Sequence, residues 1–216
     1  MHGEATCASH PVVSRCALCA RPGPGMGASG WSGWGIGSRC PRCSAGAIET
    51  QHDARARIPV VRAAMADIGI ALTRRVRVTL ADPAKLSRTP NAPPGVLGLT
   101  HQLGGPSGFA TVAIEIASGL TPTHFGATLA HEIGHAWLAE RTADVISPLL
   151  EEGVCEVFAG AWLKRRPDPL AASLRDAMAA NPDPVYGAGY RAVRAAVAAK
   201  GIRAVLHSVT RSGSLP

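Results

Sequence analysis

Aromatic residues are scarce in this sequence, at 4% of its 216 residues, and no long hydrophobic run is present. A helix that crosses a membrane needs about 20 predominantly apolar residues in a row, so none is predicted. The first six residues, Met-His-Gly-Glu-Ala-Thr, also lack the basic start and apolar stretch of a secretory signal peptide. We therefore expect a cytoplasmic protein without a membrane partner. With 46% hydrophobic residues, the chain can still form a core, built from Ala, Val, Leu and Ile.

Acidic residues are outnumbered 22 to 15 by Lys and Arg, which gives the chain a net charge of +7. Basic proteins often bind nucleic acid or other acidic surfaces. Here the excess is spread along the chain, and its one cluster, Arg74-Arg75-Val76-Arg77, alternates in the way a half-buried strand does. We interpret the charge as a solvated surface and expect no nucleic-acid partner.

The chain length favours one main domain and a small module, which we place at 47–216 and 1–46. Alternating apolar residues predict strands at 75–80, 96–100 and 109–117, the last with Val112, Ile114 and Ile116 on one face. Helices are predicted over 121–138, from 148 to about 166, and near 169–180, 184–200 and 201–210. An earlier helix is predicted to break or restart at Pro59 and to bury Val60, Ala63, Ala64 and Ile68. A small sheet followed by helices indicates an α+β fold.

Five of the six cysteines lie before residue 44, and four of them form two pairs. The pairs Cys16-x2-Cys19 and Cys40-x2-Cys43 have the spacing of a structural zinc site with four thiolates. Disulfides are the alternative, but they need an oxidising compartment. Cys7 and His10 have the spacing of half of another site, without a second pair nearby, and Cys155 is interpreted as a small buried hydrophobic residue.

The segment 131–135, His-Glu-Ile-Gly-His, is the strongest chemical signal in the sequence. Residues four apart on a helix share a face, so His131 and His135 can direct ring nitrogens at one zinc ion. Glu132 lies about 100° around the helix, where it is free to accept a proton from a zinc-bound water. Thr121 followed by Pro122 resembles a helix start, and the segment is therefore predicted to lie inside a helix.

A catalytic zinc site usually has three protein ligands and one open position, so a third ligand is expected. The metzincin pattern is excluded because Leu138 and Arg141 stand where it needs Gly and His. A second helix that begins at Ser147-Pro148 carries three candidate carboxylates, on Glu151, Glu152 and Glu156. We predict Glu152 as the ligand, Glu156 as a residue that orients a ligand imidazole, and Glu151 as pointing elsewhere. The alternative is that all three form a solvated helix surface.

Several segments of the chain occur together in one known family. They are HEIGHAWL at 131–138, EEGVCEV at 151–157 with AWL at 161–163, DPVYGAGYR at 183–191, and KGIR at 200–203 with Leu206-His207. In this order they resemble the carboxy-terminal domain of the plant LIM-domain peptidases that regulate organ size. The resemblance implies a zincin-like, gluzincin-type peptidase domain with a LIM-like or zinc-ribbon module before it. It also implies His131, His135 and Glu152 as zinc ligands and Glu132 as the base.

That family is described as activated by ubiquitin, and the sequence departs from it at three points. We expect no ubiquitin-interacting helix before the zinc module. The cysteines complete one zinc knot where a LIM domain has two, and Glu156 stands where the plant proteins have Gln. We expect the peptidase chemistry to carry over, whereas ubiquitin activation and the plant substrates are not expected to. The composition, rich in Ala, Arg and Gly, suggests a bacterial relative.

The sequence therefore predicts a zinc peptidase that hydrolyses an intracellular protein or peptide, with one catalytic and one structural zinc. Tyr186 is a candidate donor to the oxyanion of the transition state, and His207 is a weaker one. Both can also be ordinary packed or surface residues. Two other functions stay open: a bacterial peptidase that cleaves a repressor, and an inactive zinc-ribbon adaptor that binds protein.

Overall fold

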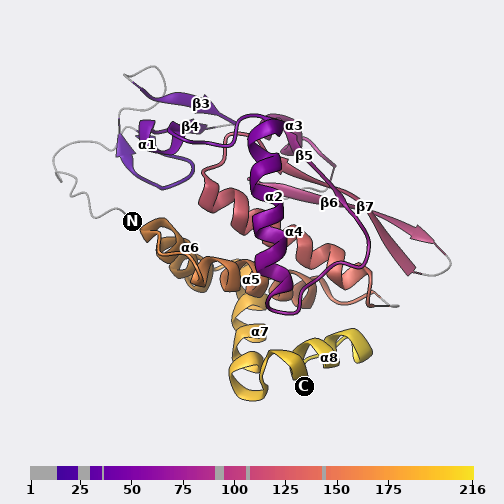
Figure 1. Ribbon diagram of the computed structural model, residues 1–216. Helices are drawn as coiled ribbons and strands as arrows, with labels where there is room; N and C mark the ends of the chain where they lie inside the picture. Colours follow the sequence, from indigo (N-terminus) through magenta and orange to yellow (C-terminus); the bar gives the residue numbers. More distant parts are fainter. Residues whose placement is uncertain (1–13, 24–29, 36, 91–94, 106–107, 143–144) are drawn as a thin grey trace.

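A computed structural model describes residues 14–23, 30–35, 37–90, 95–105, 108–142 and 145–216 (Figure 1). Three strands form the main sheet in the order β5-β7-β6: β5 (Arg77–Ala81), β6 (Gly98–Gly105) and β7 (Gly108–Ala117). Strand β5 runs parallel to β7, and β6 runs antiparallel to it at the edge of the sheet. The helices are α2 (Gln51–Ala66), α3 (Pro83–Leu86), α4 (Pro122–Ala139), α5 (Pro148–Lys164), α6 (Pro169–Ala180), α7 (Tyr186–Lys200) and α8 (Ile202–Ser212). The predicted mixed α+β architecture is confirmed.

The segment that carries the paired cysteines folds into two small hairpins and one helical turn. Strand β1 (Ser14–Arg15) pairs with β2 (Pro22–Gly23), β3 (Ser32–Trp34) pairs with β4 (Gly37–Arg39), and α1 covers Pro41–Ser44. Within the described part of the chain, no helix is both long and apolar enough to cross a bilayer.

Helix α4 is the centre of the core. Its start follows the sequence signal, because the Thr121 side chain accepts a hydrogen bond from the His124 backbone amide and Pro122 occupies the first turn. Helix α5 begins in the same way at Ser147 and Pro148. Nearly the whole circumference of α4 is buried, between the sheet on one side and α2 and α5 on the other (Figure 1).

Glycines allow α4, α5 and α7 to pack closely. A Cβ atom at Gly134 of α4 would lie 2.8 Å from the Cys155 sulfur of α5. One at Gly153 of α5 would lie 2.5 Å from the carbonyl oxygen of Gly189 in α7. Real Cβ atoms are not found at such distances, so glycine is required at both contacts. They hold the histidine helix, the glutamate helix and the start of α7 together.

The prediction of a break at Pro59 is wrong. Helix α2 continues through this residue, and the residues that it buries are Ala54, Val61 and Met65. Val60 is 51% exposed and Ala63 is also exposed, whereas Ala64 and Ile68 are partly buried against the core. A proline in a helix removes one backbone hydrogen bond, and here the packing of α2 against α4 outweighs that loss.

The strand predictions are right in place and wrong in detail. Strand β6 begins at Gly98 and extends to Gly105, instead of covering 96–100. Ile114 and Ile116 are fully buried as predicted, but Val112 is 47% exposed. Strand β5 begins opposite Ala113, so the earlier residues of β7 have no partner in β5, and the β6–β7 register shifts between His101 and Gln102. Beyond this register shift, β6 and β7 pair only with each other and extend away from the core as a two-stranded hairpin (Figure 1).

Candidate metal centre

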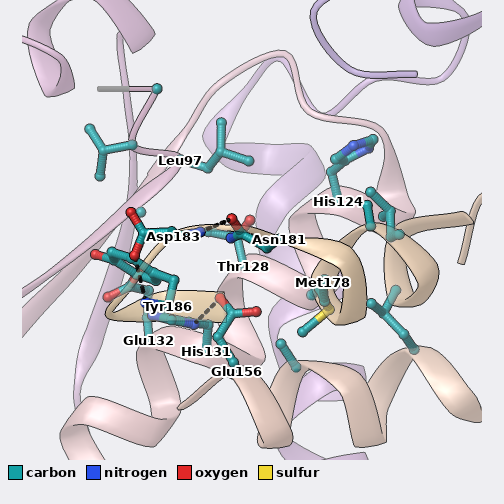
Figure 2. A pocket seen from close by; sticks show the side chains of 18 of the residues that line it. Leu97, His124, Thr128, His131, Glu132, Glu156, Met178, Asn181, Asp183 and Tyr186 are labelled. Atoms are coloured by element: carbon teal, nitrogen blue, oxygen red, sulfur yellow. Dashed lines mark hydrogen bonds and ion pairs between the residues drawn. The ribbon is translucent and has the colours of Figure 1, made fainter. Parts of the chain in front are cut away.

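Helices α4 and α5 border a pocket of about 860 Å³ that is closed further by α6 and by the turn before α7 (Figure 2). His131, Glu132, Glu156 and Tyr186, all singled out in the sequence, line one part of it. Ring stacking joins two of them, since the His131 and Tyr186 centroids lie 6.4 Å apart at an interplanar angle of 23°.

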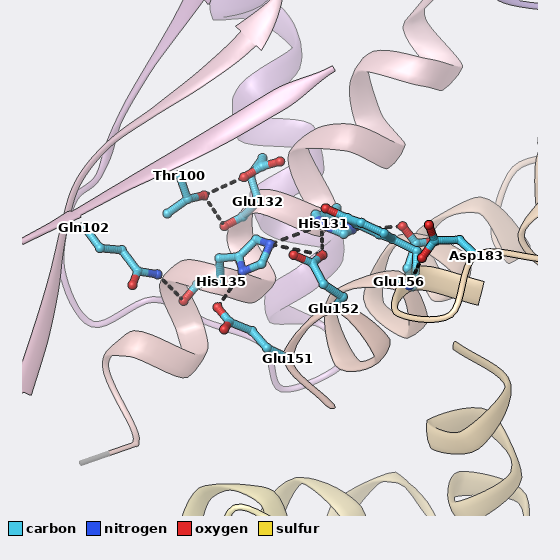
Figure 3. Close-up of polar contacts among 10 residues, drawn as sticks. Thr100, Gln102, His131, Glu132, His135, Glu151, Glu152, Glu156 and Asp183 are labelled. Carbon is cyan, nitrogen blue, oxygen red and sulfur yellow. Dashed lines mark hydrogen bonds and ion pairs between the residues drawn. The ribbon is translucent and has the colours of Figure 1, made fainter. Parts of the chain in front are cut away.

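Three side-chain atoms converge beside this pocket (Figure 3). The Nε2 atoms of His131 and His135 lie 3.2 Å apart. Oε2 of Glu152 lies 3.1 Å from the first of these nitrogens and 3.6 Å from the second. This oxygen is buried and has no hydrogen-bond partner among the described residues. A buried carboxylate oxygen without a hydrogen bond is costly, and a metal cation held by the three atoms would satisfy it.

The far sides of both rings face carboxylates. Nδ1 of His131 lies 3.2 Å from Oε1 of Glu156, and Nδ1 of His135 lies 2.8 Å from Oε1 of Glu151. When Nδ1–H donates to a carboxylate, the Nε2 lone pair is free to bind a metal. Glu156 therefore contacts the imidazole of His131, one of the two predicted ligands. The prediction that Glu151 points elsewhere is wrong, because it orients the other imidazole.

The electrostatics of the cluster favour positive charge at its centre. Burial opposes ionisation of Glu152, but the imidazoles of His131 and His135 beside it outweigh burial and lower the pKa of the carboxyl to about 2. Burial also opposes protonation of both imidazoles. The carboxylates of Glu152 and Glu156 overcome this for His131, and those of Glu151 and Glu152 overcome it for His135, so that both histidine pKa values lie well above the ordinary value. The site attracts either protons or a cation.

Cys155 offers an alternative third ligand. Its sulfur lies within 4.8 Å of ring nitrogens of His131 and His135. We favour Glu152 because its oxygen lies 3.1 and 3.6 Å from the two Nε2 atoms and its pKa is lowered to about 2, so that it is already ionised. The Cys155 sulfur is fully buried against Gly134, and burial raises the pKa of its thiol, so it keeps its proton.

Glu132 is 5% exposed and is held by the edge strand β6. The hydroxyl of Thr100 lies 2.7 Å from Oε2 of Glu132, to which it donates. Gly98 gives the carboxylate its space, because a Cβ atom there would lie 2.7 Å from Oε1 of Glu132. The sequence analysis found neither Thr100 nor Gly98. A glycine in the middle of the predicted strand 96–100 was the one available signal.

The turn at 181–185 fixes Tyr186 at the start of α7. Oδ1 of Asp183 accepts hydrogen bonds from the backbone amides of Val185 and Tyr186, both at 2.8 Å. Burial and the charge of Glu152 raise the pKa of the Tyr186 phenol, which therefore keeps its proton and remains a donor. His207, the weaker candidate, is exposed on α8 and is not among the residues that line the pocket.

The second candidate metal site is formed by the sulfurs of Cys16, Cys19, Cys40 and Cys43, which are all buried and lie within 4.8 Å of one another. The Cys19 and Cys40 sulfurs are 3.7 Å apart, and none of the four cysteines forms a disulfide. A hydrogen bond from Cys43 lowers the pKa of the Cys16 thiol to about 4, while burial raises that of Cys19 to about 11. Cys7 and His10 lie outside the described residues.

The cysteine segment is tied directly to the turn before α4. Nη1 of Arg39 donates to the carbonyl of Gly119 at 2.6 Å, and Nε1 of Trp34 donates to that of Ser118 at 2.7 Å. Gly119 has φ +79 and no room for a side chain beside these two groups. The two candidate metal sites are therefore connected by one short, well-packed segment of chain.

Comparisons with known proteins find relatives of the part of the chain that contains this candidate site. A family model described as "DA1-like: Protein DA1" matches residues 99–174, which include both histidines, Glu132 and the three glutamates of α5. The chain is 30% identical over 132 residues to Protein DA1 of Arabidopsis thaliana and 28% identical over 138 residues to Protein DA1-related 2. Each match covers 48% of this chain and about a quarter of the relative, 25% and 26% respectively.

A shorter match, 44% identical over 52 residues, is to Protein DA1-related 1 and covers 24% of this chain and 9% of the relative. No solved structure matches the chain. About half of this chain, with the candidate metal centre inside it, is thus similar to a part of the Arabidopsis DA1 proteins.

Proposed function

We propose that this chain is a zinc-dependent peptidase that hydrolyses peptide bonds of a protein or peptide substrate. The observation that carries the proposal is the convergence of two Nε2 atoms and one unpartnered carboxylate oxygen beside the buried carboxylate of Glu132. Two histidines and one glutamate are the ligand set of a known class of catalytic zinc sites, which leaves a position open for water.

The separations of the three atoms fit zinc. Bonds of about 2.0–2.1 Å in tetrahedral geometry place neighbouring ligand atoms about 3.3–3.4 Å apart. The observed separations, 3.1, 3.2 and 3.6 Å, lie around this value. Zinc–sulfur bonds of about 2.3 Å give about 3.8 Å between sulfurs, close to the 3.7 Å between Cys19 and Cys40. We therefore assign zinc to both sites.

When bound at His131, His135 and Glu152, zinc supplies a Lewis acid and lowers the pKa of its water to about 7. Glu132 then accepts the proton of the attacking water and returns it to the leaving amine nitrogen. Thr100 holds one oxygen of Glu132 and leaves the other for the proton. Glu151 and Glu156 keep the imidazoles in the tautomer that presents Nε2. The protonated phenol of Tyr186 donates to the oxyanion.

The proposal includes a zincin-like arrangement for the main domain, with the zinc helix packed against a sheet whose edge strand is β6. An extended substrate can pair with the free edge of this strand beside Glu132. The hairpins around the four cysteines then form a structural zinc module of the zinc-ribbon or LIM-like type.

Glu132→Gln tests the chemistry directly, because it removes the base and keeps the size of the side chain. We expect peptide hydrolysis to fall by 10²-fold or more in a peptide-library assay. Metal content, measured by mass spectrometry, should stay at two zinc ions per chain. Equal hydrolysis by the variant and the parent would contradict the mechanism.

The ligand set has its own test. His131→Ala should reduce the zinc content from two ions to one, and loss of neither ion would remove the basis for the site. If both proteins bind two zinc ions and neither cleaves any peptide, the adaptor function becomes the better account of the chain.

A further inference from the structure

We propose that the pocket beside Glu132 selects a bulky apolar side chain on one of the two substrate residues that flank the cleaved bond. This inference rests on the proposed peptidase function, because it assigns the pocket to a substrate. It adds a class of side chain that the metal centre by itself does not specify.

The position of the pocket makes it a part of the site. His131 and Glu132 line it, so a substrate carbonyl that lies between them places a neighbouring side chain at its entrance. The segment Gly95–Gly98, which leads into the edge strand β6, forms one wall. A peptide that pairs with β6 therefore runs along the opening.

The chemistry of the walls favours an apolar occupant. Leu97, Leu163, Leu174 and Met178 contribute branched or long apolar side chains, and Ala127 and Ala159 leave space between them (Figure 2). The volume of about 860 Å³ exceeds what any single side chain fills, so size does not exclude Phe, Trp, Leu or Met. Burial of such a side chain against these walls is favourable in proportion to its apolar area.

Charged occupants are disfavoured by what lines the pocket. Among the described lining residues none is Lys or Arg, so a substrate carboxylate finds no basic side chain of these two types to pair with. The carboxylates of Glu156 and Asp183 are already engaged, by His131 and by the amides of Val185 and Tyr186. A charged group that enters past them loses water without gaining a partner.

A substitution that narrows the pocket should change which substrate side chain is preferred, and this preference can be measured. Ala127 lies one helical turn before His131 and lines the pocket, so Ala127→Leu fills it from the floor. Ala139→Leu, near the end of the same helix and outside the pocket, is the matched control. Peptides with Phe, Leu, Ala, Lys or Glu at either position beside the bond are compared by kcat/KM.

We expect Phe or Leu at one position to be cleaved at least 10-fold faster than Ala. Ala127→Leu should reduce this preference about 10-fold with two zinc ions still bound, and Ala139→Leu should leave the preference unchanged. A preference for Lys or Glu, or an equal loss for all peptides in Ala127→Leu with zinc retained, overturns the inference.

A measurement of peptide binding tests the pocket assignment independently of the proposed peptide hydrolysis. The Phe and Ala peptides are titrated into zinc-loaded Glu132→Gln protein and followed by fluorescence anisotropy. If no peptide is cleaved by the parent protein but the Phe peptide binds 10-fold tighter than the Ala peptide, hydrolysis fails and the pocket assignment stands. If both peptides bind equally, the pocket assignment fails whatever the activity.

Discussion

The carboxylate of Glu132 is held from the side of the sheet by two residues of strand β6. Thr100 donates to one oxygen, and the missing side chain of Gly98 makes room for the other. Both residues lie about thirty positions before Glu132 in the chain. The carboxylate of the proposed base is therefore positioned by the sheet, whereas the proposed zinc ligands are positioned by α4 and α5.

Gly98→Ala should separate these two roles. The added methyl group would lie 2.7 Å from Oε1 of Glu132 and 2.7 Å from Cγ2 of Thr128, so the carboxylate must move. A displacement of about 1 Å at a catalytic group can cost about 10²-fold in rate. We expect a loss of that order in kcat with two zinc ions still bound, measured by peptide hydrolysis and metal analysis. An unchanged kcat would show that the contact does not position the base.

Residue spacing was sufficient to bring His131, His135 and Glu152 together, because the helical period places them on facing surfaces. Residue spacing was insufficient to predict where the side chain of Glu151 lies. The faces of α5 were assigned from its own period, and the crossing of α4 over α5 then turned Glu151 toward His135. Thr100 and Gly98 come from a strand and follow no period shared with the histidines.

At the scale of elements, the end of α4 is fastened to the loop before β5 through Glu140. Its carboxylate accepts the backbone amides of Thr73 at 2.8 Å and Arg74 at 3.0 Å, and its side chain is 10% exposed. Burial works against ionisation, but these hydrogen bonds and Arg141 outweigh it and lower the pKa of Glu140.

This gives a prediction for acid stability. Because the pKa of Glu140 is lowered on folding, its contribution is complete above the ordinary value near 4.5 and is lost as the pH falls through the lowered value. Glu140→Gln should lower the free energy of unfolding by about 1–3 kcal/mol at pH 7, measured by urea denaturation. The difference between the two proteins should shrink below pH 4.5. A constant difference down to pH 2.5 would contradict the assignment.

Element ends were predictable wherever a cap and a proline coincide, as at Thr121-Pro122 and Ser147-Pro148. The continuation of α2 through Pro59 could not be predicted from the sequence. Proline is unfavourable inside an isolated helix, and only the tertiary contacts of α2 with α4, α5 and β5 explain why the helix continues.

At the scale of the whole molecule, the cysteine segment supports the start of the zinc helix. Arg39 is 7% exposed and joins three groups: the Gly119 carbonyl, the Glu49 carboxylate and the Ser44 hydroxyl. Ile48 adds a backbone bridge to Leu120. The cysteine spacing predicted a metal site in this segment, but it contained no information about where the segment docks.

Arg39→Ala should therefore weaken α4 while leaving the cysteines intact. We expect a loss of about 2–3 kcal/mol, which lowers the melting temperature by about 5–10 °C in a chain of this size. Hydrogen exchange should become faster at residues 118–125, with two zinc ions still bound. Cys43→Ser is the comparison: it should show the same faster exchange together with the loss of one zinc ion. Normal exchange at 118–125 in both variants would mean that the docking does not support α4.

The backbone contact between Gly153 and Gly189 has a practical consequence for trimming the chain. Residues 99–174, the part that matches the DA1-like family model, include the three proposed ligands of the catalytic zinc and the proposed base, but not the four cysteines. They omit Tyr186 and the backbone of α7 against which α5 packs. They also omit Arg39, which binds the Gly119 carbonyl in the turn before α4. A fragment cut at those limits would keep the ligands and lose the scaffold that aligns them. Boundaries for excised versions of this protein should follow helix contacts and not the extent of sequence similarity.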